Sequence, residues 1–472
     1  MEKIEIDDSI NNEEQLDQPF VKSPEEKRFV RKLYWFVLPL IWCVIFIQFV
    51  DKAILSVASG TGLLEDTNMT LQQYNWVSGV VYLGYLVYQV PNNILIQILP
   101  HSKYLGCIIV LWGIVTCITS ICNTFQQMMA VRFLLGLTEA GALPTVYIVL
   151  NTLFRRSEHS IVYGFTIMSS GTGTVIGTLI GILIVLYLDG VDGKRAWRWG
   201  YLIFGVITIF IGILVFFLLI DEPNSKLLRL TEKEKEIVKD RTKDNMVVKT
   251  RKIKRYQILE AFKEARFWCL GLATLLINFQ ASGLITYSVL LVQSLGFNSV
   301  QSVILQLPSG FFAFLFVLIA VVCIRRYNQS IYVGIIFTCL TIIGCIILVS
   351  TETVAGKLFG YYLTWTQSVP QATFIIIVGN NVSGYTKKVT YNGAMFVCYV
   401  LGSFVGPFFM QDYRYGIVGY IIGDVFVILL LLYIRYDMAK ENKKRKENAL
   451  GEKPDVNLDL TDRENNTFTF IL

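Results

Sequence analysis

Four ionisable residues lie inside two segments that are otherwise apolar enough to cross a membrane, and a fifth, Asp424, lies nearer the end of a third segment. Asp51 and Lys52 fall in the segment 34–58, and Arg132 and Glu139 fall in the segment 127–150. A charged side chain at the centre of a span costs about 2.5–3.5 kcal/mol on insertion scales, so such residues are rare and commonly mark substrate or proton pathways. These four residues are therefore the first candidates for chemistry in this chain.

The residue types divide the possible roles. Arg132 and Glu139 are seven positions apart, which is two helical turns, so they share one helix face roughly 10 Å apart along the axis. A carboxyl group in lipid is favoured in its neutral form by desolvation, which makes Asp51 and Glu139 candidate proton carriers. Arg132 and Lys52 are candidate anchors for an anion. Lys52 either faces an internal cavity or extends outward beside the loop.

The elements that must hold these residues are apolar helices. The sequence is 54% hydrophobic and only 17% charged, whereas soluble domains carry about 25% charged residues. Stretches of roughly 20 apolar residues recur along the chain, the length needed to cross about 30 Å of hydrocarbon. We predict an all-α polytopic membrane protein with about twelve spans, at 34–58, 74–98, 104–122, 127–150, 162–187, 199–220, 267–291, 302–323, 331–349, 357–379, 390–407 and 416–434.

Loop charges give the orientation. With both termini in the cytoplasm, most of the 42 lysines and arginines fall on the inner side, as the positive-inside rule requires. Asp51 and Arg132 then lie at similar depth in the outer third of the membrane, where they could pair, and Glu139 lies near the middle. The pair is either a permanent ion pair that locks two helices or part of a working site.

The longest internal loop separates two sets of six spans. Within it, Thr231 to Glu234 form a capping-box sequence that predicts the start of a helix. The predicted organisation is a cytoplasmic tail (1–33), a first six-helix bundle (34–220), a cytoplasmic loop (221–266), a second six-helix bundle (267–434) and a cytoplasmic tail (435–472).

The second bundle has amide and hydroxyl groups where the first has charges. Tyr287 falls in the seventh span, Gln306 in the eighth, and Gln367 and Gln371 in the tenth, where their 3–4 spacing makes a polar stripe. Such groups either bond neighbouring helices or contact substrate. The contrast between a charged first bundle and a neutral, polar second bundle suits a substrate that is held by its anionic end against the first bundle.

Other kinds of site find little support. The nine cysteines form no CxxC pair, and the two histidines lie far apart in sequence, so we expect no metal, no catalytic centre and no cofactor other than the proton as coupling ion. The positive-inside rule accounts for the basic charge, so we expect no nucleic-acid partner. Asn68 begins an Asn-Met-Thr glycosylation sequon in the first outer loop.

Several motifs resemble a known family. The stretches 75–113 (NWVSGVVYLGYLVYQVPNNILIQILPHSKYLGCIIVLWG) and 132–159 (RFLLGLTEAGALPTVYIVLNTLFRRSEH) resemble the anion:cation symporter branch of the major facilitator superfamily. Within these stretches LPHSKYLG and LFRRSEH, and beyond them DEPNSKLLRLTEKEKEIV (221–238) and VSGYTKKVTYNGAMFVCYVLGSFVGP (382–407), resemble the fungal allantoate permease family.

The resemblance implies a major facilitator fold and proton-coupled uptake of an organic anion, such as allantoate, ureidosuccinate, nicotinate or another carboxylate. It assigns the family's acidic–basic pair to Asp51 and Lys52, with lysine where arginine is commoner, and its fourth-span arginine and glutamate to Arg132 and Glu139. Gln89 stands where many members have an acidic residue.

We therefore expect a monomeric, multi-pass transporter in the plasma membrane, with an internal membrane as the alternative location, and not an enzyme. Its partners would be a small organic anion, protons and lipid. In the empty carrier Asp51 would pair with Arg132, and protonation of Asp51 would release Arg132 for the substrate. The rival function is a nutrient sensor that signals without flux; the short predicted tails argue against it.

Overall fold

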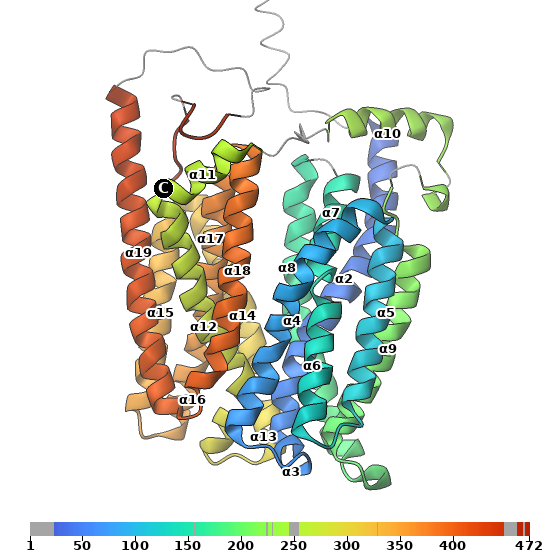
Figure 1. Cartoon of the computed structure of the whole chain (residues 1–472), viewed down its shortest axis with the longest axis vertical. Helices are drawn as coiled ribbons and strands as arrows, with labels where there is room; N and C mark the ends of the chain where they lie inside the picture. The colour runs from blue at the N-terminus through green and yellow to red at the C-terminus, as the bar shows by residue number, and fades with distance from the viewer. Residues whose placement is uncertain are drawn as a thin grey trace, which may run out of the picture.

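The computed structural model describes residues 23–154, 156–222, 225–228, 230–244, 254–327, 329–447, 460–465 and 468–472. The described part is helical, and its long helices form two bundles that stand side by side (Figure 1). The first bundle contains α2 (Pro24–Gly60), α4 (Leu71–Ile98), α5 (His101–Thr119), α6 (Phe125–Glu139), α7 (Ala142–Leu153), α8 (Arg156–Leu188) and α9 (Ala196–Leu218). The short α3 (Leu63–Asp66) and η1 (Val191–Gly193) lie in its outer loops.

The second bundle repeats this organisation. It contains α12 (Ala265–Ser294), α13 (Ser299–Ile304), α14 (Leu307–Tyr327), α15 (Ser330–Ser350), α16 (Val354–Thr364), η3 (Trp365–Gln367), α17 (Ser368–Asn381), α18 (Tyr385–Phe409) and α19 (Tyr413–Glu447). Within the described residues, ten helical segments are long and apolar enough to cross a membrane. The predicted all-α polytopic fold with two bundles is confirmed.

Three of the predicted spans are interrupted by a short turn that is not α-helical, and in the eighth span this turn lies close to the outer end. The fourth span divides into α6 and α7, the eighth into α13 and α14, and the tenth into α16, η3 and α17. A break within a membrane leaves backbone groups without helical partners, and it is tolerated where protein or a water-filled cavity surrounds it. Glu139, Gln306 and Gln367 lie at the three breaks, so each break carries a polar side chain that the sequence had singled out.

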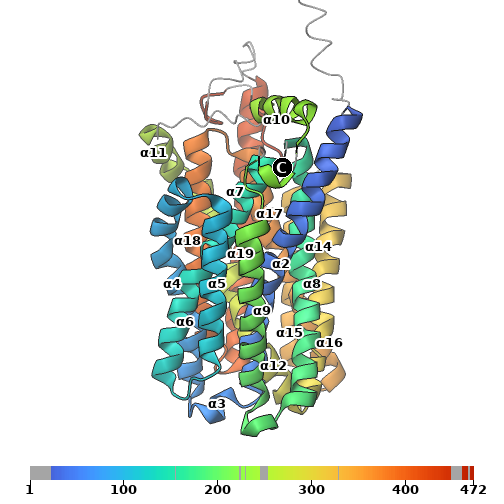
Figure 2. The ribbon, with the colours of Figure 1, turned by 90° about the vertical axis from the view of Figure 1, so that its right-hand side faces the viewer.

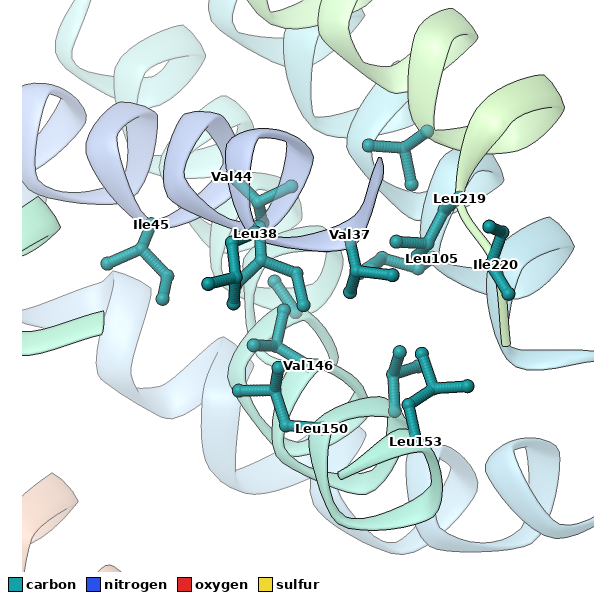
Figure 3. Close-up of a cluster of buried hydrophobic side chains, with 14 of the residues drawn as sticks. Val37, Leu38, Val44, Ile45, Leu105, Val146, Leu150, Leu153, Leu219 and Ile220 are labelled. Atoms are coloured by element: carbon teal, nitrogen blue, oxygen red, sulfur yellow. The ribbon is translucent and has the colours of Figure 1, made fainter. Parts of the chain in front are cut away.

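Apolar side chains hold the cytoplasmic part of the first bundle together. Val37, Leu38, Val44 and Ile45 of α2 face residues of α5, α7 and the end of α9 (Figure 3). In lipid the tails are as apolar as the core, so packing rather than water exclusion must favour this association. The close fit of branched side chains in this cluster supplies that packing.

Glycines let helices approach closely within each bundle. A Cβ atom at Gly177 of α8 would lie 2.6 Å from Val50 of α2, and one at Gly402 of α18 would lie 2.2 Å from the Leu275 carbonyl oxygen of α12. Neither position has room for a larger residue. Gly177, together with Gly173 one turn earlier, therefore serves close packing of α8 against α2, the helix that carries Asp51 and Lys52.

The central loop is shared between the bundles. Its helix α10 (Glu232–Asp244) begins at the predicted capping box, where the Thr231 N–H donates to Glu234 at 2.9 Å. α10 is tied to α2 by the ion pair between Lys32 and Glu234 (2.6 Å). A second helix, α11 (Arg255–Lys263), packs instead against α12 and α18. Both helices lie at the same end of the molecule (Figure 2).

The two bundles are joined at their outer ends. α2 packs against α12, α4 against α18, and α8 against α13 and α14. In the described part of the chain, every hydrogen bond between membrane helices of the two bundles lies at the outer end. These bonds are Ser56 to Ser288 (2.7 Å), Ser56 to the Val289 N–H (3.2 Å), Tyr74 to the Thr286 carbonyl (3.0 Å), Tyr287 to Asn75 (2.5 Å) and Gln293 to the Gly60 carbonyl (2.9 Å). The structure is therefore closed on its outer side.

Candidate functional site in the first bundle

The four charged residues come together inside the first bundle. Asp51 is 4% exposed, Arg132 2% and Glu139 1%, whereas Lys52 is only partly buried. Asp51 lies within electrostatic range of Glu139, Arg132 and Lys52. Two acids and two bases thus share one buried region, although they come from two different helices.

Glu139 lies at the break in the fourth span. It is the last residue of α6, and α7 begins three residues later, after Gly141. A Cβ atom at Gly141 would lie 2.8 Å from both Asn92 and the Tyr104 hydroxyl, so only glycine fits this crowded break. Tyr85 and Gln48 lie beside the carboxyl group. Its Oε1 atom is buried and has no hydrogen-bond partner in the described structure.

Arg132 is held by an aromatic residue. Its Nη2 donates to the Tyr201 hydroxyl, and its guanidinium carbon lies 5.2 Å from the centre of the Tyr201 ring. Tyr201 is buried on α9 and packs edge-on against Trp197. The Nε atom of Arg132 is buried without a partner among the described residues. One donor of the guanidinium thus remains for another acceptor.

The expected pairing of Asp51 with Arg132 is not seen in this state. Among the ion pairs within 4.0 Å that the described residues form, none joins these two side chains, because Tyr201 takes the arginine. Asp51 lies beside Trp112 instead. The Oδ1 atom of Asp51 and the indole Nε1 of Trp112 are both buried without a partner in the part of the chain that is described.

Lys52 faces the second bundle. Its Nζ lies 5.3 Å from the centre of the Phe49 ring and close to Tyr399 of α18, with Tyr82 and Glu139 also in electrostatic range. The sequence left open whether this side chain turns inward or extends to the outer surface. In the structure it turns inward, between the two bundles.

The neutral residues predicted in the second bundle do not form one group. The Tyr287 hydroxyl donates to Asn75 at the outer contact between bundles (2.5 Å), and Gln371 accepts from Asn278 (2.9 Å). Gln306 accepts from Tyr361 (2.8 Å), which leaves its Nε2 without a partner, and the Oε1 of Gln367 is likewise unpartnered within the described residues. Gln306 and Gln367 therefore keep free polar atoms, whereas Tyr287 and Gln371 are engaged.

Sequence reasoning missed the residues that surround the charges. Tyr201, Trp112 and Tyr85 are aromatic residues in apolar spans, where such residues are common, so no local pattern identifies them. Gln48 is the exception, because it precedes Asp51 by three positions and so shares its helix face.

The glycosylation candidate is positioned at the outer surface. Asn68 is exposed between α3 and α4, with a left-handed backbone (φ 51°) that asparagine tolerates. Thr70, the third residue of the sequon, caps α4 by accepting from the Gln73 N–H. Modification of Asn68 stays a prediction.

Three carboxylates outside the membrane core have the composition of a metal site, but a lysine fills it. Glu260, Glu264 and Asp462 lie together at the cytoplasmic end of the second bundle. The Lys387 ammonium donates to all three, at 2.8, 2.6 and 2.6 Å. An ammonium group thus takes the place that a cation would occupy.

Comparison with known proteins agrees with this architecture. Residues 41–407 match the family model of the Major Facilitator Superfamily. The allantoate permease of Saccharomyces cerevisiae is 30% identical, over 95% of this chain and 87% of that protein. The thiamine pathway transporter of the same yeast is 29% identical, over 94% of this chain and 86% of that protein.

Solved structures show the same fold at much lower identity. A bacterial homologue of the human lysosomal transporter Spinster, in an inward-facing and unoccupied conformation, is 14% identical with a TM-score of 0.66, covering 84% of this chain and 95% of that one. Together with the two bundles and the buried charges, these matches identify a membrane transporter rather than an enzyme. The chain belongs to the Major Facilitator Superfamily, within a fungal family of allantoate permease-like secondary transporters.

Proposed function

We propose that this transporter carries a small organic anion into the cell together with protons. The observation that carries the proposal is the buried group of Asp51, Glu139 and Arg132, in which each side chain keeps a polar atom without a partner in the described structure. A buried polar atom without a hydrogen bond is costly, by about 1–3 kcal/mol, so such atoms are uncommon unless a ligand or proton completes them.

Arg132 is the anchor for the anion in this proposal. A guanidinium group offers donors in a plane that matches a carboxylate, and the Tyr201 bond leaves its Nε available. Lys52 adds a second positive charge from the side that faces the other bundle. The free amide groups of Gln306 and Gln367 would contact the uncharged part of the substrate across the interface.

Asp51 and Glu139 carry the protons in this proposal. When Asp51 is charged, it competes with the substrate for Arg132, and when it is protonated the arginine is left for the substrate. Glu139, at the helix break, holds a second proton near the middle of the membrane. One proton that enters with a monovalent anion moves no net charge, so only the pH difference drives that cycle, with about 1.4 kcal/mol or tenfold accumulation for each pH unit. A second proton adds about 2.3 kcal/mol for each 100 mV of membrane potential.

A secondary transporter also needs two alternating states, and the structure with its closed outer side corresponds to one of them in this proposal. The hydrogen bonds at the outer end would have to break for substrate to enter from outside, and the halves would then meet at their cytoplasmic ends. Rocking of two rigid halves around a fixed central site is the mechanism that many such carriers use.

The decisive experiment is uptake of labelled candidates by cells that lack their own permeases. Allantoate, ureidosuccinate, nicotinate and a dipeptide would be compared at several external pH values, with Glu139→Gln as the matched variant. Accumulation of one anion that increases as external pH falls, and that Glu139→Gln abolishes, is the expected result. If one of these compounds is accumulated equally at every pH, or equally well by Glu139→Gln, the proposed coupling is wrong.

Location and assembly belong to the same proposal. We expect a monomer in the plasma membrane. A fluorescent fusion in intact cells, with pairwise cross-linking in the native membrane, tests both. Fluorescence confined to an internal membrane, or a specific cross-linked dimer, would contradict this part of the proposal.

A further inference from the structure

The end of the chain packs onto the cytoplasmic end of the second bundle. The described residues 460–465 and 468–472 lie against α11, α12, α18 and α19 (Figure 1). Residues 460–465 are polar and follow a charged run, whereas residues 468–472 (FTFIL) are apolar. Three groups of contacts hold the segment in place.

The first group is a set of buried charges. Asp462 and Lys387 both have fully buried side chains, and they form an ion pair at 2.6 Å. The other carboxylate oxygen of Asp462 accepts from Arg266 at 2.9 Å. The Ser383 hydroxyl, just before α18, donates to the Leu460 carbonyl at 2.8 Å. One residue of the tail thus bonds to cations on both α12 and α18.

The second group surrounds Phe470. This buried ring lies between two guanidinium groups, at 4.5 Å from Arg266 and 4.8 Å from Arg445. Arg445, on the extension of α19, also donates to the carbonyl oxygens of Asp462, Asn465 and Phe468. A single arginine therefore fixes the path of the segment at several points.

The third group fixes the backbone at the end of the segment. The side chain of Asn381 bonds to both the N–H (2.7 Å) and the carbonyl (3.0 Å) of Ile471. Asn442 bonds in the same way to Phe470, at 2.9 Å for both contacts. The Ser330 N–H donates to the Leu472 carbonyl. These bonds add the ends of α17 and α15 to the elements that the segment joins.

The segment supplies charged partners to a buried cluster of the second bundle. At the core of the cluster two buried cations, Lys387 and Arg266, face two buried carboxylates, Glu264 and Asp462. Glu260 is a further carboxylate on Lys387 (2.8 Å), and the segment brings Arg463 as well, which pairs with Glu264 at 3.0 Å. Without the segment, Lys387 would lose one of its three carboxylate partners and Arg266 would lose its shortest ion pair. Loss of one partner from a buried group of charges is destabilising.

We propose that residues 460–465 and 468–472 form a strap that joins this charge cluster and locks the cytoplasmic ends of α11, α12, α18 and α19 into one rigid unit. Rocking between two states requires each half to move as one body. The strap supplies this rigidity where the second half projects beyond the membrane. The proposal does not depend on which substrate is carried.

Hydrogen exchange of the purified full-length carrier in lipid nanodiscs tests the strap. Asp462→Asn keeps the side-chain shape but removes the charge, and Glu447→Gln removes a charge from the exposed end of α19 as the matched control. We expect Asp462→Asn to increase exchange about tenfold in α11 and in the first turns of α18, and to leave α4 and α6 unchanged. Equal exchange in the two variants, or an increase spread over both bundles, would overturn the proposal.

A disulfide gives a second test that does not rest on the removal of a charge alone. Asn381→Cys and Ile471→Cys, in a background without the native cysteines, should form a disulfide on mild oxidation, because the Asn381 side chain contacts the Ile471 backbone. Oxidation should raise the melting temperature and restore slow exchange when Asp462→Asn is added. Failure of the pair to cross-link, or cross-linking without a change in melting temperature, would contradict a docked strap.

Discussion

Two clusters in this carrier both bring acidic and basic side chains together, but only one of them forms close ion pairs. The membrane cluster consists of Asp51, Lys52, Arg132 and Glu139, and the strap cluster is built around Lys387 and Asp462. In the strap cluster the Lys387 ammonium has three carboxylate partners within 2.8 Å. In the membrane cluster no ion pair within 4.0 Å forms between the described acids and bases, and several polar atoms lack partners.

This difference in pairing indicates that the strap cluster stabilises the fold and that the membrane cluster serves transport. A buried charge whose bonds are all made stabilises one arrangement, because any change breaks a bond. A buried charged group that lacks a hydrogen-bond partner is unfavourable until a proton or ligand supplies one. A carrier needs such a group at its binding site. Variants at matched positions should therefore affect stability in one cluster and transport in the other.

The largest effect is expected for the carboxyl group at the helix break. Glu139→Gln keeps the shape and hydrogen-bonding capacity of the side chain but cannot take part in proton release. Accumulation of the anion against its gradient should fall by about tenfold for each pH unit imposed across the membrane, while exchange of internal for external substrate continues. Counterflow and net uptake in the same vesicles measure the two activities. Loss of both together would show a binding or folding defect instead.

Two lysines provide the most direct comparison of the clusters. Lys387→Met should destabilise the protein by about 3–5 kcal/mol, because it leaves three carboxylates together without their cation. Lys52→Met should leave the melting temperature within about 2 °C of the parent and strongly reduce uptake. Thermal unfolding and uptake, measured for both variants, check the comparison. A stable Lys387→Met protein would remove the distinction between the clusters.

Tyr201 should act through Arg132. Tyr201→Phe keeps the ring but removes the hydroxyl acceptor, so the guanidinium is released toward Asp51. We expect the apparent KM for the anion to rise about tenfold with little change in the maximal rate, since about 1.4 kcal/mol of positioning is lost. A double variant with Asp51→Asn should recover part of the affinity. A change in maximal rate alone would contradict this role.

The smallest effect concerns pH and the strap. Burial opposes ionisation of Asp462, but Lys387 and Arg266 hold the pKa of this carboxyl below its ordinary value. A carboxylate with a lowered pKa contributes its full stability above the ordinary value of about 3.9 and loses it only as pH falls through the folded value. Strap-dependent stability should therefore be constant from about pH 5 to pH 8, whereas uptake should change over the same range. Differential melting of the parent and Asp462→Asn at each pH tests this. If the difference in melting temperature between the parent and Asp462→Asn becomes smaller at any pH above 5, this prediction is wrong.

The fold could be predicted further than the site. Hydropathy and loop charges located the spans because membrane thickness fixes helix length and the positive-inside rule fixes orientation. The charges of the membrane cluster were also evident, since lipid makes each of them exceptional. The three helix breaks each lie just before a proline, at Pro144, Pro308 and Pro370. Because proline lacks the N–H group of a helical hydrogen bond, the sequence does mark these positions for interruption.

The sequence could not predict which side chains bond to one another. Asp51 and Arg132 were expected to bond because their depths agree, but depth says nothing about rotation around a helix axis, and Tyr201 takes the arginine. The strap was missed for a related reason. Its polar residues look like a solvated tail, and only the folded positions of Arg266, Lys387 and Asn381 make them partners.

The central claim, that the membrane cluster couples protons to an anion, is tested most directly by proton flux. The purified carrier would be reconstituted in vesicles that contain a pH-sensitive dye, and the anion identified by the uptake screen would be added outside without any imposed gradient. We predict that the anion acidifies the vesicle interior with the parent carrier and has no such effect with Glu139→Gln. Anion entry without acidification in the parent, at the same rate as in Glu139→Gln, would contradict the claim.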